Sequence, residues 1–308
     1  MYNRLRRRGQ AMTPAGRRFH PDARDQRRPT ATTRPEHINQ LRQTILNLAV
    51  RGQLVSQDPS GEPASELLGR IHAEKARRIN AGSLRKEKPL PPIVEEEVPF
   101  AIPEQWKWTR IGTASLLTEY GTSVKSDKME NGVPVLAMGA IQEGRVILGN
   151  GKKVPREIGD LPQLFLKRLD LLYNRTNSAE LVGKTGIYLG DDDAYTFASY
   201  LIRIRFLNDL TNPVYANLAM NAPYFRPTQI VPELKQQCGQ ANVNGSKLRN
   251  MVIPMPPLAE QHRIVAKVDE LMALCDRLEE QLTTTQTESH GLLEAVLHQA
   301  LNGKDVLG

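Results

Sequence analysis

Hydrophobic residues near the carboxy-terminal end of the chain recur at every third or fourth position, and this spacing predicts one long helix. The repeat follows Pro254, Pro256 and Pro257, which cannot lie inside a helix because proline lacks an N–H group and clashes with the preceding turn. Its members are Ile264, Val268, Leu271, Cys275, Leu278 and Leu282, and the same register resumes at Leu292 and Val296. Over residues 258–303 the helix would extend roughly 65 Å, at about 1.5 Å per residue, and bury its narrow apolar stripe against another helix.

Two shorter helices are predicted before the centre of the chain. Over residues 36–55, helical spacing is shown by Ile38, Leu41, Ile45, Leu48 and Ala49, and the pattern ends at Gly52. We expect this helix to pair antiparallel with the long one through Leu41, Ile45 and Leu48. A second helix is predicted from Pro63 to Asn80, with the proline in its first turn.

These helices define an expected helical region over residues 35–82. A charged, proline-rich linker over residues 83–103 follows it and favours extended polyproline geometry. We therefore expect a domain boundary at this linker.

Residues 104–257 show short β-like runs separated by Gly, Asn and Asp turns. The clearest predicted strands are Val133–Met138, Leu169–Tyr173, Lys184–Leu189 and Ser199–Phe206, and a helix is expected near Asn212–Met220. The predicted fold class is therefore α+β: one compact mixed domain flanked by helical segments, with a long coiled-coil helix after it.

The composition is that of a folded chain without a membrane span. Hydrophobic residues make up 40% of the 308 positions, yet no run of about 18 apolar residues occurs. The arginine-rich start also lacks the apolar core of a secretory signal. Cys238 and Cys275 give neither a disulfide framework nor zinc-ligand spacing, which is typical of a protein of the reducing cytoplasm.

The net charge of +7 is distributed unevenly along the chain. Residues 1–34 carry ten arginines against two aspartates, and we expect a disordered basic tail there, with a nucleic-acid-binding arm or an extension upstream of the true start as alternatives. Residues 104–257 hold 18 Lys and Arg against 14 Asp and Glu, whereas residues 258–302 hold three basic and eight acidic residues. DNA phosphates would attract the central domain and repel the long helix, which suits a protein partner. Residues 304–308 are expected to form a short tail.

A search for catalytic motifs finds two weak candidates. Asn221–Tyr224 is similar to the Asn-Pro-Pro-Tyr loop of adenine methyltransferases, but one proline is missing and no Gly-rich cofactor loop lies upstream, so a turn after a helix is the simpler interpretation. Glu233–Lys235 matches the end of a nuclease metal site, which would need an upstream aspartate on a neighbouring strand. No phosphate-binding loop, zinc cluster or nucleophile elbow is present. We therefore expect no catalytic residue and no metal site.

Four polar segments of the central domain offer the side chains that DNA readout needs: residues 120–128, 149–156, 175–178 and 236–244. Arg and Lys suit guanine, Asn and Gln suit adenine, and phosphate contacts fix the register. The candidate DNA-binding residues are Thr122, Ser123, Lys125, Lys128, Lys152, Lys153, Arg156, Arg175, Asn177, Ser178, Lys184, Arg226, Gln236, Gln237, Gln240, Asn242 and Asn244. Each segment alone could equally be a solvated turn stabilised by its own Asn and Ser side chains, but four in one basic domain favour DNA binding.

Several long segments resemble one protein family. Residues 257–282, PLAEQHRIVAKVDELMALCDRLEEQL, resemble the spacer-helix region of the DNA-specificity (S) subunits of type I restriction–modification systems. Leu41–Asp58, Glu62–Ile79 and Pro99–Trp108 carry the same resemblance near the start of the chain, and Asn174–Leu189 with Ala198–Arg205 is similar to the target-recognition domain of such subunits. The resemblance extends from about residue 35 to residue 303.

The resemblance implies a non-catalytic, cytoplasmic subunit that selects a bipartite DNA site for its partners. Those partners would be adenine methyltransferase subunits that bind S-adenosylmethionine and an ATP- and Mg-dependent translocating endonuclease subunit, with no cofactor on this chain. Family members usually carry two target-recognition domains, whereas this sequence shows one domain and one spacer helix. We therefore expect either two copies to pair or another specificity subunit to supply the second half. A stand-alone adenine methyltransferase or nuclease, and a coiled-coil adaptor without a DNA role, are the alternatives.

Overall fold

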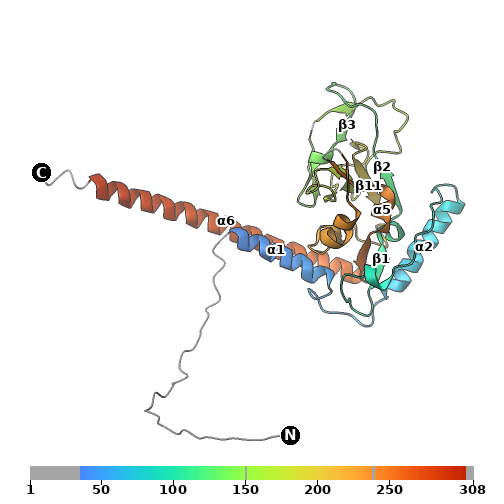
Figure 1. Ribbon diagram of the computed structural model, residues 1–308, viewed down its shortest axis with the longest axis horizontal. Helices are drawn as coiled ribbons and strands as arrows, with labels where there is room; N and C mark the ends of the chain where they lie inside the picture. The colour runs from blue at the N-terminus through green and yellow to red at the C-terminus, as the bar shows by residue number, and fades with distance from the viewer. Residues whose placement is uncertain (1–34, 150, 238–239, 303–308) are drawn as a thin grey trace, which may run out of the picture. The chain divides into compact units, whose positions relative to one another are not determined.

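The computed structural model describes residues 35–149, 151–237 and 240–302 (Figure 1). The tails expected over residues 1–34 and 304–308 lie outside this described part of the chain. The described residues combine short β-strands and helices with one long C-terminal helix, which confirms the predicted α+β fold class.

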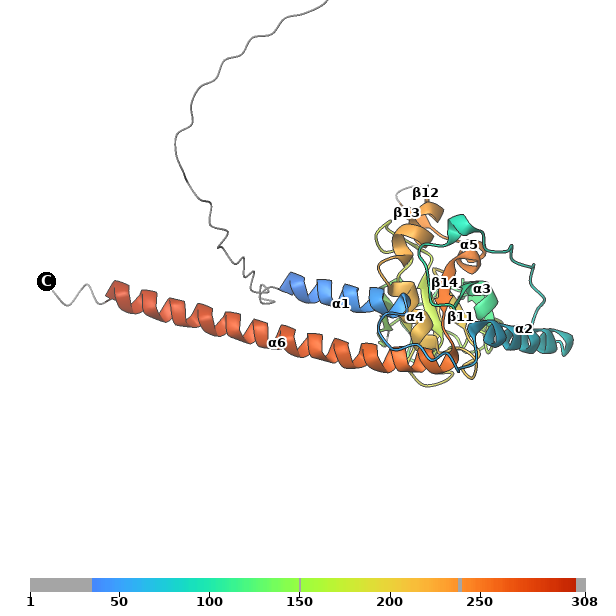
Figure 2. The same cartoon turned by 90° about the horizontal axis from the view of Figure 1, so that it is seen from below.

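The long helix, α6, spans Leu258–Asn302 and contains 45 residues. It begins where the proline segment ends, and the carbonyl of Pro257 accepts hydrogen bonds from the backbone N–H groups of Glu260 and Gln261. The far end of α6 extends away from the strands (Figures 1 and 2). Within the described ranges, no helix combines the length and the hydrophobicity that a membrane crossing requires.

The first helix, α1 (Pro35–Val50), lies antiparallel along the inner part of α6 (Figure 2). The guanidinium of Arg42 contacts the carboxylates of Asp276 at 2.7 Å and Glu279 at 2.6 Å. Farther along, the amide of Gln57 donates to the Glu260 carboxylate at 2.6 Å. Later residues of one segment thus face earlier residues of the other, as an antiparallel pair requires.

The buried stripe of α1 follows the predicted spacing in part, because it includes Ile38 and Ala49 but also Leu46, which the spacing did not include. Ile38, Leu46 and Ala49 are buried and Ile45 is half-buried, whereas Leu41 is 38% exposed and Leu48 is only half-buried. The reason is that α1 packs against α4 (Pro213–Asn221) as well as against α6, so its buried face is turned toward both helices. Leu41 therefore lies at the margin of this face.

The second helix, α2 (Ala64–Asn80), follows Pro63 and packs against the short helix α3 (Ile111–Ala114). The ammonium of Lys75 donates to the carbonyls of Gly112 and Ser115, at 2.8 Å each. Because the ammonium is largely shielded from water there, burial lowers the pKa of Lys75.

The proline-rich segment after α2 is anchored to the central domain. The buried guanidinium of Arg110 donates to the carbonyls of Pro91 and Pro92 and pairs with Glu97 at 2.8 Å. Arg249 pairs with Glu87 at 2.7 Å. These contacts give the segment a fixed path, and the described chain from residue 35 onward forms one compact unit.

Four small sheets build the central domain. A six-stranded sheet has the order β2-β11-β7-β9-β5-β4, and three-stranded sheets have the orders β10-β3-β6 and β12-β13-β8. Strands β1 and β14 pair antiparallel at the start of α6. The strands are β1 Lys107–Arg110, β2 Leu117–Tyr120, β3 Val133–Leu136, β4 Ile141–Gln142, β5 Arg145–Val146, β6 Lys153–Val154, β7 Leu171–Asn174, β8 Thr176–Asn177, β9 Thr185–Ile187, β10 Thr196–Phe197, β11 Leu201–Arg205, β12 Lys235–Gln237, β13 Gln240–Asn242 and β14 Val252–Met255.

Short helical turns complete the domain. These are α5 Gly245–Asn250, η1 Glu95–Glu97, η2 Met138–Ala140, η3 Arg226–Ile230 and η4 Val231–Glu233. The main core joins α1, α2, α4 and the start of α6 to the six-stranded sheet, through side chains such as Trp106, Tyr215, Ile264 and Val268. One hydrophobic core therefore fixes the beginning of the long helix to the central domain.

Candidate DNA interface

The first two polar segments of the central domain lie against each other. Residues 120–128 follow β2, and residues 149–156 lead into β6. Asp127 and Lys153 exchange two backbone hydrogen bonds, of 3.0 Å and 2.9 Å. This short antiparallel bridge places two segments about 25 residues apart in sequence side by side.

The other two polar segments form one small sheet. Strand β8, from residues 175–178, pairs antiparallel with β13, from residues 236–244. The backbone N–H of Val243 donates to the carbonyl of Arg175 at 2.9 Å. Segments that are more than 60 residues apart in the sequence therefore share one β-ladder.

Tyr120 connects the two pairs of segments. The guanidinium carbon of Arg175 lies 4.8 Å from the centroid of the Tyr120 ring. The Tyr120 hydroxyl accepts a hydrogen bond from the backbone N–H of Gly245 at 2.6 Å. All four polar segments are thus linked by direct contacts into one cluster.

Gly121 allows this cluster to close. A Cβ atom at this position would lie 2.2 Å from the carbonyl oxygen of Phe197 and 2.4 Å from that of Ala198. No side chain fits against these backbone atoms, so only glycine permits the close approach. The segment after β2 is held there by the hydrogen bond from Thr122 N–H to the Phe197 carbonyl, at 2.9 Å.

Lysine side chains gather where the first two segments meet. Lys125, Lys128 and Lys152 are exposed, and Lys128, Lys152 and Lys153 line one surface hollow. The ammonium of Lys153 donates to the carbonyl of Glu130 at 2.7 Å, which fixes its direction. The exposed ammonium groups suit contacts to phosphate, because a lysine charge can approach a phosphate oxygen from many directions.

Three of the predicted residues are used by the fold itself. The Thr122 side chain is buried, donates to Asp160 at 2.5 Å and accepts from the Val124 N–H. Arg226 donates to the carbonyls of Val182, at 2.7 Å, and Ala179. Asn244 caps α5, where its side chain accepts from the Lys247 N–H. The proposed interface therefore does not include these three side chains.

The remaining predicted residues differ in exposure. Ser123, Arg156, Ser178 and Lys184 are exposed, whereas Arg175, Asn177 and Asn242 are half-buried. The backbone of Gln236, Gln237 and Gln240 lies in the β12–β13 hairpin, but their side chains lie outside the described part of the structure.

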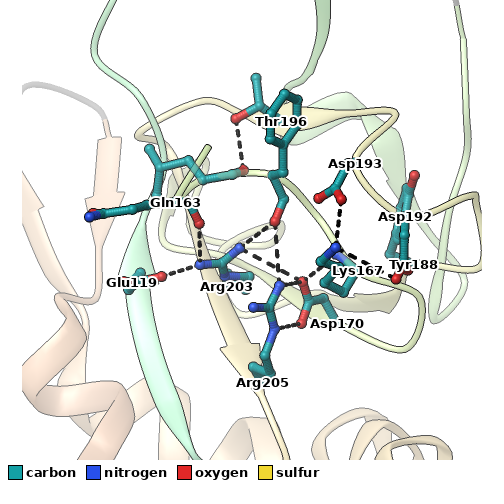
Figure 3. Close-up of polar contacts among 12 residues, drawn as sticks. Glu119, Gln163, Lys167, Asp170, Tyr188, Asp192, Asp193, Thr196, Arg203 and Arg205 are labelled. Atoms are coloured by element: carbon teal, nitrogen blue, oxygen red, sulfur yellow. Dashed lines mark hydrogen bonds and ion pairs between the residues drawn. The ribbon is translucent and has the colours of Figure 1, made fainter. Parts of the chain in front are cut away.

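A buried ion network joins β11 to β2, the strand that ends at Tyr120, and the sequence analysis did not predict it (Figure 3). Arg203 on β11 is 1% exposed and pairs with Glu119 on β2 and with Asp170 at 3.8 Å. Arg205 donates two hydrogen bonds to the Asp170 carboxylate, at 2.7 Å and 2.6 Å. Burial, and then the neighbouring Arg205 charge, lower the pKa of Arg203. The only available signal was the spacing of the two arginines, which puts both on one face of the strand.

Two exposed aromatic residues of the cluster were also missed. The side chain of Tyr120 is 44% exposed and that of Tyr200 is 49% exposed. Tyr200 precedes β11, and its carbonyl accepts the N–H of Arg175 at 3.1 Å. Large aromatic side chains left in contact with water beside basic groups are typical of binding surfaces.

The first weak catalytic candidate, Asn221–Tyr224, has a structural role. The Asn221 amide donates to the Thr185 carbonyl at 3.0 Å and to the Asn217 carbonyl at 2.8 Å. Tyr224 is buried edge-on against Phe100 and Trp108, and this burial raises its pKa. In the ranges that the structure describes, no group of three or more His, Cys, Asp or Glu residues is arranged to hold a metal ion.

The outer part of α6 forms a second candidate interface. Ile264, Val268 and Cys275 are buried and Leu271 is half-buried, but from Asp276 onward most described side chains are exposed. Of the predicted interface residues, Leu282 is half-buried, while Leu278, Leu292 and Val296 are 42%, 68% and 53% exposed. Arg42 of α1 contacts Glu279 of α6 at 2.6 Å, and the apolar residues Leu292 and Val296, farther along α6, are exposed.

Comparisons with known proteins place the chain in one family. The family model described as the type I restriction modification DNA specificity domain matches residues 103–285, which include the central domain and the inner part of α6. The EcoAI specificity subunit of Escherichia coli is 33% identical over 277 residues, covering 87% of this chain and 45% of that protein. The EcoEI specificity subunit, also from Escherichia coli, is 31% identical, covering 89% of this chain and 47% of that protein.

A solved HsdS subunit from Thermoanaerobacter tengcongensis aligns with a TM-score of 0.45 at 18% identity, covering 86% of this chain and 54% of the other. The chain spans about half the length of the curated relatives it matches. Because the family model covers more than half of the sequence, the chain belongs to the family of type I restriction modification DNA specificity domains.

Proposed function

We propose that this chain recognises a DNA sequence for a type I restriction–modification complex, while other subunits carry out catalysis. The observation that supports this most is the cluster of four polar segments, which Tyr120 holds together in a chain of this family. The relatives EcoAI and EcoEI are named specificity subunits. The proposed partners are adenine methyltransferase subunits and an ATP-dependent endonuclease subunit, which would bind their own cofactors in the same cytoplasm.

In this proposal the lysines and the polar side chains of the cluster have different tasks. Lys125, Lys128 and Lys152 contact phosphates, which gives affinity without sequence preference. Side chains of residues 175–178 and of Asn242 contact base edges, which gives specificity. The central domain as a whole carries more basic than acidic residues, and this favours approach to DNA.

We further propose that the α1–α6 pair holds the protein partners. The segment 258–302 has eight acidic and three basic residues, so it would be repelled by DNA. The exposed apolar residues of its outer part, among them Leu292 and Val296, are the proposed contact with a second copy of this chain. Two copies joined in this way would read two identical half-sites in inverted orientation, which is the proposed bipartite site. Another specificity subunit on the same surface is the competing arrangement.

The DNA-reading part of the proposal is tested by binding measurements on the chain assembled with its methyltransferase. Replacing Lys125, Lys128 and Lys152 by alanine should weaken binding to all sequences and reduce the slope of log K against log salt by about one for each lost phosphate contact. The matched control is Lys107→Ala, because Lys107 is exposed on β1, next to the start of α6 rather than in the cluster. Equal affinity and equal salt slopes in the triple variant and the control would contradict the proposal.

The pairing part is tested by light scattering of the purified chain, alone and with a methyltransferase subunit. Two copies per complex are expected, and Leu292→Asp with Val296→Asp should separate them without unfolding the domain. A complex that always contains one copy of this chain and one methyltransferase would rule out the pairing. Mapping of methylated sites in a host genome, with and without the gene, then gives the target sequence.

A further inference from the structure

We propose that Arg175 reads a guanine base in the target sequence and that Tyr120 is the positioning residue that holds Arg175 for this task. The inference rests on the proposed DNA-binding function and deepens it, because it assigns one base contact to one side chain. Arg175 differs in its partners from the other arginines of the central domain that are shielded from water. One of these, Arg226, also has no carboxylate partner among the described residues, but it donates through both Nη1 and Nη2 to the Val182 and Ala179 carbonyls.

Four other shielded arginines have carboxylate partners in the structure. Arg110 pairs with Glu97, and Arg249 pairs with Glu87. Arg203 and Arg205 share the buried carboxylate of Asp170. Each of these charges is thereby neutralised inside the fold, as buried charges require.

Arg175 is half-buried but has no carboxylate partner among the described residues. Its guanidinium donates through Nη1 to the carbonyl of Ser199 at 3.0 Å and lies against the Tyr120 ring. These contacts orient the group and leave its positive charge for another acceptor. Guanine offers two acceptors, O6 and N7, on its major-groove edge, and arginine is the side chain that most often contacts them.

The backbone of Arg175 is fixed as well as its side chain. Its N–H donates to the Tyr200 carbonyl at 3.1 Å, and its carbonyl accepts the Val243 N–H at 2.9 Å. A base contact needs such fixed geometry, because a planar guanidinium must meet acceptors in defined positions. The exposed ammonium groups of Lys125, Lys128 and Lys152 have no side-chain hydrogen bond or ion pair among the described residues, which suits phosphate contacts instead.

Tyr120 contacts both Arg175 and the start of α5. Its ring supports the guanidinium, while its hydroxyl accepts the N–H of Gly245 at the start of α5. A Cβ added at Gly245 would lie 3.0 Å from the Tyr120 hydroxyl, so the two residues are already in close contact. The end of β2, the start of β8 and the start of α5 therefore meet at this one aromatic side chain.

The test is to map methylated sequences produced by the chain assembled with its methyltransferase, for the wild type and for substituted chains. Arg175→Ala should relax the preference for guanine at one position of the target by roughly 5- to 150-fold, the range expected for one good bidentate contact. Arg175→Lys should relax the same position, because lysine keeps the charge but loses the planar fork and the stacking on Tyr120. The positions read by other residues should keep their preferences.

Tyr120→Ala should reduce the guanine preference at the same position to a smaller extent. Tyr120→Phe should keep most of that preference, because the ring is retained. A purely structural role for Tyr120 would instead lower the preference at every position together. The matched control is Arg156→Ala, which removes the same charge from an exposed arginine of the neighbouring segment. It should weaken binding to all sequences while leaving the recognised motif unchanged.

The inference is overturned if Arg175→Ala and Arg175→Lys weaken binding equally for all sequences, because Arg175 would then contact phosphate. It is also overturned if the motif is unchanged in both variants. If the wild-type complex itself shows no sequence preference, the proposed function fails rather than this assignment. Thermal unfolding of each variant identifies a chain that has lost its fold, and the lysine and phenylalanine variants then provide the decisive comparison.

Discussion

The central domain buries charged side chains, whereas the outer part of α6 exposes apolar ones. In the domain, Arg203 and Asp170 are both 1% exposed and lie together inside the fold. On outer α6, the apolar side chains of Leu292 and Leu301 are 68% and 70% exposed to water. The domain thus pairs these buried charges with each other, whereas the outer helix leaves apolar surface uncovered. This difference agrees with the proposal that outer α6 contacts a second copy of the chain.

The inner part of α6 lies between these extremes. Ile264 and Val268 belong to the core of the domain, and Gln261 accepts the backbone N–H of Asn212 at 2.8 Å. The helix therefore changes from a core element to an exposed rod within a few turns. Substitutions along this path should separate fold stability from partner binding.

The largest loss of stability is expected in the buried ion network. Asp170→Ala leaves Arg203 and Arg205 without their shared carboxylate, and breaking such a buried pair costs about 3–5 kcal/mol. Urea unfolding, followed by circular dichroism, measures this change. The control is Asp192→Ala, because Asp192 is 57% exposed and its 3.7 Å ion pair with Lys167 should contribute about 1 kcal/mol or less. A similar small loss in both variants would show that the network does not support the domain.

The second prediction compares two positions on the same helix. Ile264→Ala removes a fully buried side chain and should lower the free energy of unfolding by about 2–5 kcal/mol. Leu292→Ala removes an exposed side chain and should change it by about 0.5 kcal/mol or less. The same two variants should show the reverse order when pairing of copies is measured by light scattering. A large loss of stability in Leu292→Ala would break the distinction between inner and outer α6.

The third prediction concerns the joint between α6 and the domain. Glu260 is 2% exposed and accepts hydrogen bonds from the Trp106 indole at 3.0 Å and from Gln57 at 2.6 Å. Glu260→Ala leaves the buried indole N–H without an acceptor, which should cost about 1–3 kcal/mol of unfolding free energy. Glu260→Gln is the matched control, since it preserves the volume and one acceptor. An equal effect of the two substitutions would show that the hydrogen bonds do not matter.

The pH dependence of the same joint follows from the pKa of Glu260. Burial raises this pKa above its ordinary value of 4.5, against the opposing hydrogen bonds from Trp106 and Gln57. A raised pKa means that the folded state binds the proton more tightly, so this contribution to stability is complete below pH 4.5 and is lost as the pH rises through the folded value. The stability of the wild type relative to Glu260→Gln should therefore fall as the pH rises over this range. An unchanged difference between pH 4 and pH 8 would contradict the assignment.

The smallest effect is expected at the exposed contact between α1 and α6. Arg42 pairs with Asp276 and Glu279, and these hydrogen bonds raise its pKa. Because the side chain of Asp276 is 70% exposed, Arg42→Ala should cost about 1 kcal/mol or less and should cost still less in high salt. Arg277→Ala, an exposed arginine of α6, is the control for loss of charge alone. Equal and salt-independent losses would mean that the ion pairs contribute nothing specific.

Comparison of the prediction with the structure shows which features depend on neighbouring residues in the sequence. The expected helix over residues 258–303 is found as Leu258–Asn302, and the one expected from Pro63 is found as Ala64–Asn80. The predicted strands at residues 133–138, 169–173, 184–189 and 199–206 are found within two residues of their expected starts. Apolar spacing and proline positions act over a few residues, so they can be interpreted without the tertiary fold.

The sequence by itself determined the main helices, the longer strands, the acidic character of the long helix and the polar segments of the central domain. Only the tertiary structure decided that these segments meet at Tyr120, that Thr122 and Arg226 are occupied inside the fold, and that Arg203 is buried while Leu292 is exposed. The physical reason is that such contacts join residues far apart in the chain, where pairing register and burial depend on the whole fold. Local periodicity carries no information about those distant partners.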